Sequence, residues 1–148
     1  MNYTELVAAI KSYTENDYST TDVNTFIQNA EQRIYNTVQI PDLRKNVEGT
    51  MSSGNKYFTL PSDWLSTFSI AVINSSNEYT YLLNKDVNFI REAFPDTDSG
   101  FYAQPEYYGI FDDNTMILGP TPDANYSAEL HYYYYPQTIV TAGNTWLG

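Results

Sequence analysis

Residues 130–136, which read LHYYYYP, indicate the kind of fold that this chain adopts. In a β-strand, successive side chains point to opposite faces of the sheet, so both faces of this strand are aromatic. We expect such a strand to be covered on both sides, or to present its second face to a partner. The two faces carry, respectively, Leu130, Tyr132 and Tyr134, and His131, Tyr133 and Tyr135.

Aromatic residues are abundant in the rest of the chain too, at 16% of 148 residues, with 15 tyrosines among them. Tyrosine combines a large apolar ring with a hydroxyl group, and it is enriched where another molecule covers a surface that stays partly wet. The length predicts a single domain. We expect a helical part over residues 1–45, a β-rich part over 46–140 and an exit segment over 141–148.

The chain is strongly acidic, with 7 basic and 18 acidic residues and a formal net charge of −11. Its longest basic run is Arg44-Lys45, so it lacks the clustered cations that bind a nucleic-acid backbone. It has no cysteine, no signal peptide pattern and no apolar run long enough to cross a bilayer. We therefore expect folding in a reducing cytoplasm and no membrane partner.

Two helices are predicted at the start of the chain. Asn2 and Glu5 form a capping-box pattern before apolar residues at helical spacing, and Thr21 and Asp22 are the expected caps of a second helix. This second helix should end before Pro41. Its apolar stripe consists of Val23, Phe26, Ile27, Ala30, Ile34 and Val38.

From residue 47 onward the pattern indicates short strands. We predict hairpin pairs over 47–51 with 57–60, over 67–73 with 78–83, and over 107–111 with 116–118, followed by a long strand over 126–135. Asn84 is the expected cap of a short helix that ends at Pro95, and residues 137–144 read as a polar connection. The fold class is therefore α+β, with an N-terminal helical hairpin and a mostly antiparallel sheet or sandwich interrupted by one short helix.

No catalytic, cofactor-binding or metal-binding residue stands out. His131 is the only histidine, and without a second histidine or a cysteine it does not form a zinc site. The Asp-rich segments at 96–98 and 112–113 match loop and turn chemistry better than a calcium loop. We therefore predict a non-enzymatic protein with no cofactor. The candidate subunit-interface residues are His131, Tyr132, Tyr133, Tyr134 and Tyr135.

Several longer segments carry a resemblance to a known family. The segments are AEQRIYN (30–36), LPSDWL (60–65), LLNKDVNFIREAFP (82–95), FDDNTMILGPTPD (111–123) and ELHYYYYP (129–136). With the N-terminal segment YTELVAAIKSYTEN they extend over nearly the whole chain. In these segments the chain resembles the head-to-tail adaptor (connector) proteins of tailed bacteriophages, which form a ring beneath the portal of short-tailed phages.

The resemblance implies a structural virion protein at the head–tail junction, synthesised in the cytoplasm of the host bacterium. It implies a ring of identical subunits, a dodecamer, that docks on the portal protein and receives the tail nozzle or tail tube protein, with tail fibres as a further candidate partner. It also implies a hollow axis through which DNA passes during packaging and ejection without specific binding.

One departure from the family pattern lies at the C-terminus. Similar proteins continue past TWL (145–147) into helical sequence that packs with the N-terminal helices, whereas this chain stops at Gly148. We expect either a naturally short member or an incomplete chain.

Two alternatives belong to other functional classes. A carbohydrate-binding module would stack sugars on surface aromatics. A hydrolase would need two paired carboxylates, one of them with a raised pKa, and the spacing nominates no such pair.

Overall fold

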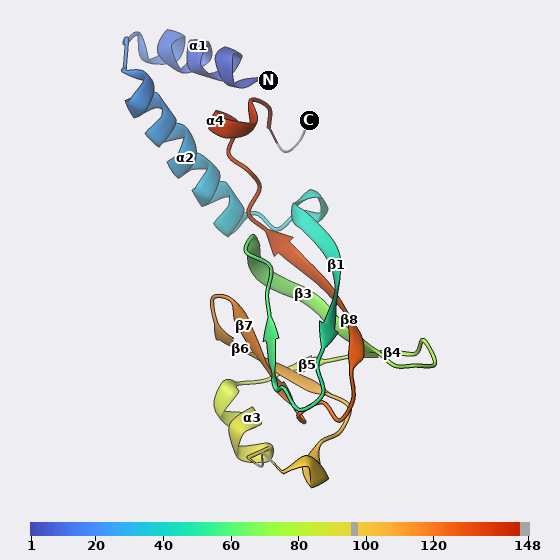
Figure 1. Cartoon of the computed structure of the whole chain (residues 1–148). Coiled ribbons are helices and arrows are strands. Elements are labelled where there is room, and N and C mark those ends of the chain that lie inside the picture. Colours follow the sequence, from blue (N-terminus) through green and yellow to red (C-terminus); the bar gives the residue numbers. More distant parts are fainter. Residues whose placement is uncertain (96–97, 146–148) are drawn as a thin grey trace. The chain divides into compact units, whose positions relative to one another are not determined.

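The computed structural model describes residues 1–95 and 98–145 of the chain (Figure 1). The described chain contains helices and two antiparallel-rich sheets, so the predicted α+β class is confirmed. It divides into two compact units, one formed by Met1–Leu43 with Tyr135–Gly148 and the other by Arg44–Tyr134. We call them the helical unit and the β unit and describe each by itself. Residues 146–148 of the predicted exit segment lie outside the described residues.

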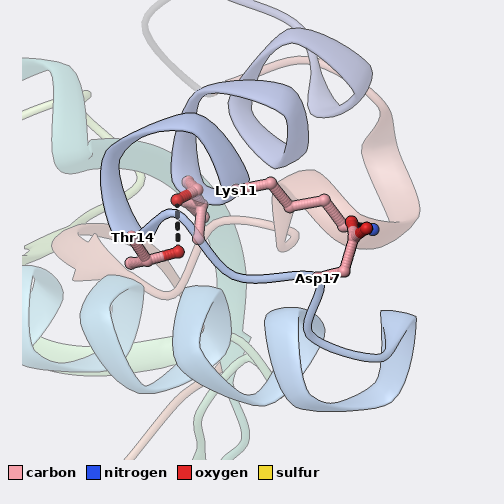
Figure 2. Close-up of polar contacts among 4 residues, drawn as sticks. Lys11, Thr14 and Asp17 are labelled. Atoms are coloured by element: carbon pink, nitrogen blue, oxygen red, sulfur yellow. Dashed lines mark hydrogen bonds and ion pairs between the residues drawn. The ribbon is translucent and has the colours of Figure 1, made fainter.

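In the helical unit, α1 (Tyr3–Thr14) begins with the predicted capping box. Asn2 Oδ1 accepts a hydrogen bond from the Glu5 amide at 2.9 Å, and Glu5 Oε2 accepts one from the Asn2 amide at 3.0 Å. The helix ends where Glu15 adopts a left-handed conformation with φ of 50°. Figure 2 shows the link that follows, where Asp17 forms an ion pair with Lys11 of α1 at 3.3 Å.

The second helix, α2 (Thr20–Thr37), begins one to two residues before the predicted caps. Ser19 is the N-cap, and its hydroxyl accepts a hydrogen bond from the Asp22 amide. The prediction of Thr21 and Asp22 as caps was therefore wrong. A capping residue needs extended backbone, which Ser19 has, whereas Thr21 and Asp22 lie inside the first turn.

The predicted polar connection over 137–144 was also wrong in part, because it contains the one-turn helix α4 (Ile139–Ala142). Thr138 caps this turn and Gly143 ends it with φ of 78°. Ile139 is 2% exposed and packs with Val23 and Ile27 of α2 to form the small core of this unit. A single turn is too short to produce a helical period, so tertiary packing decides its structure.

The β unit contains two four-stranded sheets. The first has the order β1-β8-β3-β4 and is antiparallel, and Figure 1 shows β8 between β1 and β3. Its strands are Arg44–Met51 (β1), Trp64–Ile73 (β3), Tyr79–Tyr81 (β4) and Tyr126–Tyr134 (β8). The second has the order β2-β7-β6-β5, with one parallel pair between β5 and β6. Its strands are Tyr57–Thr59 (β2), Leu83–Asn84 (β5), Tyr107–Asp112 (β6) and Thr115–Gly119 (β7).

Two of the predicted strand pairs are confirmed, since β3 pairs with β4 and β6 pairs with β7. The predicted hairpin of β1 with β2 was wrong, because these strands belong to different sheets. Residues 52–55 cross from one sheet to the other and bond to a distant loop, with the Gly54 amide donating to the Pro122 carbonyl at 2.8 Å. The turn chemistry was read correctly, but it does not determine which strand pairs with which.

The two sheets pack face to face around one core. Tyr132, Leu130 and Ile70 from the first sheet meet Met116 and Leu118 from the second. The helix α3 (Val87–Ala93) covers the opposite face of the second sheet, where a Cβ added at Gly109 would lie 3.2 Å from the Ile90 side chain. Asp86 caps α3, not Asn84 as predicted, because Asn84 already belongs to β5. Two short 3-10 helices, Pro41–Leu43 and Ser99–Phe101, complete the described chain.

Candidate functional site

The tyrosine strand β8 lies between β1 and β3, so it is a central strand, as its two aromatic faces suggested. Leu130 and Tyr132 point into the core, each 1% exposed, and Tyr134 packs at the edge of the same core. On the other face His131 is half-buried, and Tyr133 is only 8% exposed. The first face is therefore covered by the second sheet.

Tyr132 closes a polar network at the margin of this core. Its hydroxyl donates to Asp63 Oδ1 at 2.8 Å, and Lys45 Nζ donates to Asp63 Oδ2 at 2.6 Å. The Lys45 ammonium also lies 4.1 Å from the centre of the Tyr134 ring. The network therefore ties three strands or strand ends together: β1 through Lys45, the start of β3 through Asp63, and β8 through Tyr132.

The pKa values in this network are shifted. Burial raises the pKa of the Asp63 carboxyl, but the hydrogen bonds from Lys45 and Tyr132 outweigh it and hold the pKa below its ordinary value. Burial, together with the hydrogen bond to Asp63, raises the pKa of the Tyr132 hydroxyl. Asp63 is therefore a carboxylate and Tyr132 a neutral donor at neutral pH, and the network is structural in character.

The outer face of the first sheet carries a second aromatic cluster. The Phe68 ring meets the His131 ring edge-on at 5.0 Å and lies 6.2 Å from the Tyr133 ring. The Arg44 guanidinium lies over both Phe68, at 4.1 Å, and Tyr133, at 5.2 Å. Phe68 is 51% exposed, so this face is covered by its own side chains only in part.

Tyr135 belongs to the helical unit, although it directly follows the tyrosine strand. Its hydroxyl donates to Asn36 Oδ1 at 2.7 Å, and its ring lies 6.3 Å from the Tyr35 ring of α2. The run from Tyr132 to Tyr135 is thus divided, because its last member anchors the C-terminal segment to α2. That His131 and the four tyrosines contact a neighbouring subunit stays a prediction. Tyr132 and Tyr133 are buried, so most of the accessible surface of these five residues belongs to His131, Tyr134 and Tyr135.

Two further exposed rings on the outer sheet face belong to tyrosines outside the set of candidate interface residues. Tyr79 and Tyr81 of β4 are 49% and 61% exposed, and the register places them beside Ile73 and Ala71 of β3. Alternation within β3 and β4 could have placed these rings on one face. Arg44 and Asp63 gave no such signal, because their roles depend on contacts between strands far apart in sequence.

The helical unit presents an apolar groove of about 490 Å³. Phe26 and Ile34, which were predicted to lie in the apolar stripe of α2, remain 48% and 43% exposed on this groove. Val23 and Ile27 of the same stripe are buried. The groove is lined by Leu6, Ile10, Phe26, Ile27, Ala30, Glu31, Ile34, Ile139 and Thr145. Two of the six residues of the stripe thus pack inside the unit, and the other four are exposed.

Among the described residues no group of three or more histidine, cysteine, aspartate or glutamate side chains is arranged to hold a metal ion. Within residues 1–95 and 98–145 no helix has the length and apolarity needed to cross a membrane.

Comparison with known families identifies the chain. The family model described as SU10 adaptor protein matches residues 1–147. The chain belongs to the SU10 adaptor protein family. This is a family of phage head-to-tail adaptors, so the resemblance stated from the sequence motifs is confirmed. No curated protein matches the chain.

Membership in the SU10 adaptor protein family makes this chain a bacteriophage adaptor and a structural protein. This agrees with the surfaces described above, which are suited to packing against other proteins. No observation favours the glycan-binding alternative, and two of the four consecutive tyrosines are buried within the β unit.

Proposed function

We propose that this SU10 adaptor family member joins the portal protein of a phage to the tail nozzle or tail tube. Identical subunits form a closed ring, a dodecamer, at the head–tail junction, and the ring encloses a channel for the genome. The observation that carries the proposal is the family match over residues 1–147. Tail fibres are a further candidate partner.

The apolar groove of the helical unit supports this proposal. Exposed apolar residues at contiguous helical positions are uncommon on a free monomer and mark protein–protein contacts. Phe26, Ala30 and Ile34 recur on one side of α2, as expected of a helix that packs against another protein. We assign this groove to contacts within the assembled neck, with the portal or with neighbouring subunits.

The charge of the chain supports the second part of the proposal. Eighteen acidic and seven basic residues give a subunit that repels a nucleic-acid backbone. A channel lined by such subunits lets DNA pass without retaining it. The role is non-enzymatic, and it requires only assembly and a wide bore.

Assembly is tested on the purified chain and on virions. Mass photometry of the purified chain, alone and with portal protein, should show a ring that binds the portal. Phe26→Asp with Ile34→Asp should abolish portal binding or ring formation while circular dichroism keeps the wild-type spectrum. Tyr13→Asp is the control, because Tyr13 is 90% exposed on α1 and does not line the groove. A chain that never enters virions would contradict the proposal.

A further inference from the structure

The outer face of the first sheet carries two glutamates that repel each other. Glu48 of β1 pairs directly with Glu129 of β8, and both alternate with core residues, since Val47 and Leu130 point inward. Directly opposed residues on one face have Cβ atoms about 5 Å apart, and like charges in this arrangement destabilise a sheet. Among the described residues the ion pairs are Lys11 with Asp17 and Lys45 with Asp63, so neither glutamate is neutralised.

The rings around these glutamates are exposed. The register continues from Glu129 to Ala71 of β3 and on to Tyr81 of β4, and Tyr79 lies next to Tyr81 on the same face. Tyr79 and Tyr81 are among the exposed aromatic residues. We call this surface, defined by Glu48, Glu129, Tyr79 and Tyr81, the carboxylate face. It combines a negative centre with an aromatic side.

A second surface has the complementary charge. Tyr57 of β2 and Phe111 of β6 meet edge-on at 5.3 Å, and they are 41% and 38% exposed. The Lys56 ammonium lies 5.7 Å from the centre of the Tyr57 ring, and the Arg91 guanidinium lies 5.1 Å from that of Phe111. We call these four residues the cationic row. Neither cation has a carboxylate within ion-pair distance in the described part of the chain.

The two surfaces lie on opposite sides of the β unit. Phe58 of β2 and Tyr108 of β6 point into the core between the sheets. The cationic row, built on the neighbouring residue Tyr57, on Phe111 and on Arg91 of α3, therefore occupies the outer side of the second sheet, which α3 covers. The carboxylate face is the outer side of the first sheet. A contact between different surfaces on opposite sides of a subunit is heterologous, and repetition of such a contact closes a ring when the rotation between neighbours is a whole fraction of a turn.

From this arrangement we propose that the carboxylate face of one subunit docks on the cationic row of a second copy of the same chain. The inference rests on the proposed ring and names the two surfaces that meet between neighbouring subunits. In a chain with a net charge of −11, two copies repel unless local charges are complementary, and the row supplies two cations where the face presents two unpaired carboxylates. The rings of both surfaces supply the apolar part of the contact.

Charge reversal tests the joint on the full chain. Glu48→Lys/Glu129→Lys places lysines on the face, and Lys56→Glu/Arg91→Glu places glutamates on the row. Each variant alone should assemble at a protein concentration about ten-fold or more above that of wild type, measured by mass photometry. Mixed in equal amounts they should recover assembly to within about three-fold, because alternating subunits restore both joints. A mixture that stays dissociated would overturn the proposal.

A single substitution separates assembly from folding. Glu48→Lys places a cation opposite Glu129, so the isolated subunit should melt at or above the wild-type temperature while its assembly weakens. Asp42→Lys carries the same charge change at an exposed residue of the helical unit that belongs to neither surface, and it should assemble as wild type does. If Glu48→Lys assembled at the same protein concentration as wild type, the joint would be refuted but the ring would not. A wild-type chain that never self-associates would refute the ring, and with it this inference.

Discussion

At the scale of single residues, the hydroxyl group of one buried tyrosine connects distant parts of the β unit. Tyr132 is almost completely buried, yet its hydroxyl reaches a carboxylate that is 69 residues away in sequence. A buried hydroxyl without a partner is destabilising, so Asp63 makes a tyrosine acceptable at a core position. This explains how an aromatic run is accommodated inside the sheet sandwich.

Tyr132→Phe should lower the free energy of unfolding by about 1–2 kcal/mol, since it removes a hydrogen bond to a charged group and keeps the ring. Urea denaturation of wild type and variant provides the measurement. Tyr134→Phe is the matched control, because no hydrogen bond of its hydroxyl contributes to the network. Equal losses in the two variants would show that the hydrogen bond to Asp63 does not contribute to stability.

A second tyrosine predicts a pH dependence. The Tyr126 hydroxyl donates to Asp123 Oδ1 at 2.6 Å, and this hydrogen bond, followed by burial, raises the pKa of Tyr126 to about 12 from 10.0. Its folded-state pKa lies above the unfolded one, so its contribution to stability is complete below pH 10 and declines as the pH rises toward 12. Tyr126→Phe should reduce the fall in unfolding free energy between pH 9 and 11. A variant with an unchanged alkaline slope would contradict this assignment.

At the scale of elements, one carboxylate holds the last helix. Glu31 of α2 accepts hydrogen bonds from the Thr138 hydroxyl and, at 2.8 Å, from the amide of Ile139. These groups lie at the start of α4, where unsatisfied amides favour an anion. Glu31 therefore accepts a hydrogen bond from an amide of α4 that the single turn cannot satisfy internally.

Glu31→Ala should release α4 from α2, because it removes both acceptors and leaves the Ile139 amide without a partner. Hydrogen exchange measured by mass spectrometry should become faster in residues 138–142, with a loss of about 1–3 kcal/mol in local stability. Asn29→Ala is the control, since Asn29 is an exposed α2 residue without these contacts. Unchanged exchange at Ile139 would show that packing alone retains the helix.

At the scale of the whole molecule, the chain crosses between its two units at residues 43–44 and again at 134–135. The β unit is continuous in sequence and contains the core between its two sheets. The helical unit is assembled from both ends of the chain, because Ile139 completes the core formed by Val23 and Ile27. We therefore expect the β unit to fold by itself and the helical unit to need both ends of the chain.

We expect residues 44–134, expressed alone, to unfold cooperatively in urea, since the core of the β unit is contained within them. Residues 1–43 alone should be poorly helical by circular dichroism, because the apolar side of α2 loses Ile139 and short helices are marginal in water. Adding 135–145 through a flexible linker should increase their helicity. A stable, fully helical 1–43 fragment would contradict this division.

The sequence by itself determined those features that depend on neighbours along the chain. The capping box of Asn2 and Glu5, the hairpin of β6 and β7 and the central position of β8 all follow from local spacing and alternation. The family could also be recognised from the sequence, because its motifs are continuous segments.

Only the tertiary structure decided which strands pair within each of the two sheets. It also decided that the Tyr132 hydroxyl contacts Asp63, and which cations lie over aromatic rings without an ion-pair partner. Residues 52–55 read as a hairpin turn, yet they lead from one sheet to the other. The physical reason is that turn propensity acts over a few residues. Strand partners and ion pairs depend instead on how segments that are far apart in sequence pack together around a shared core.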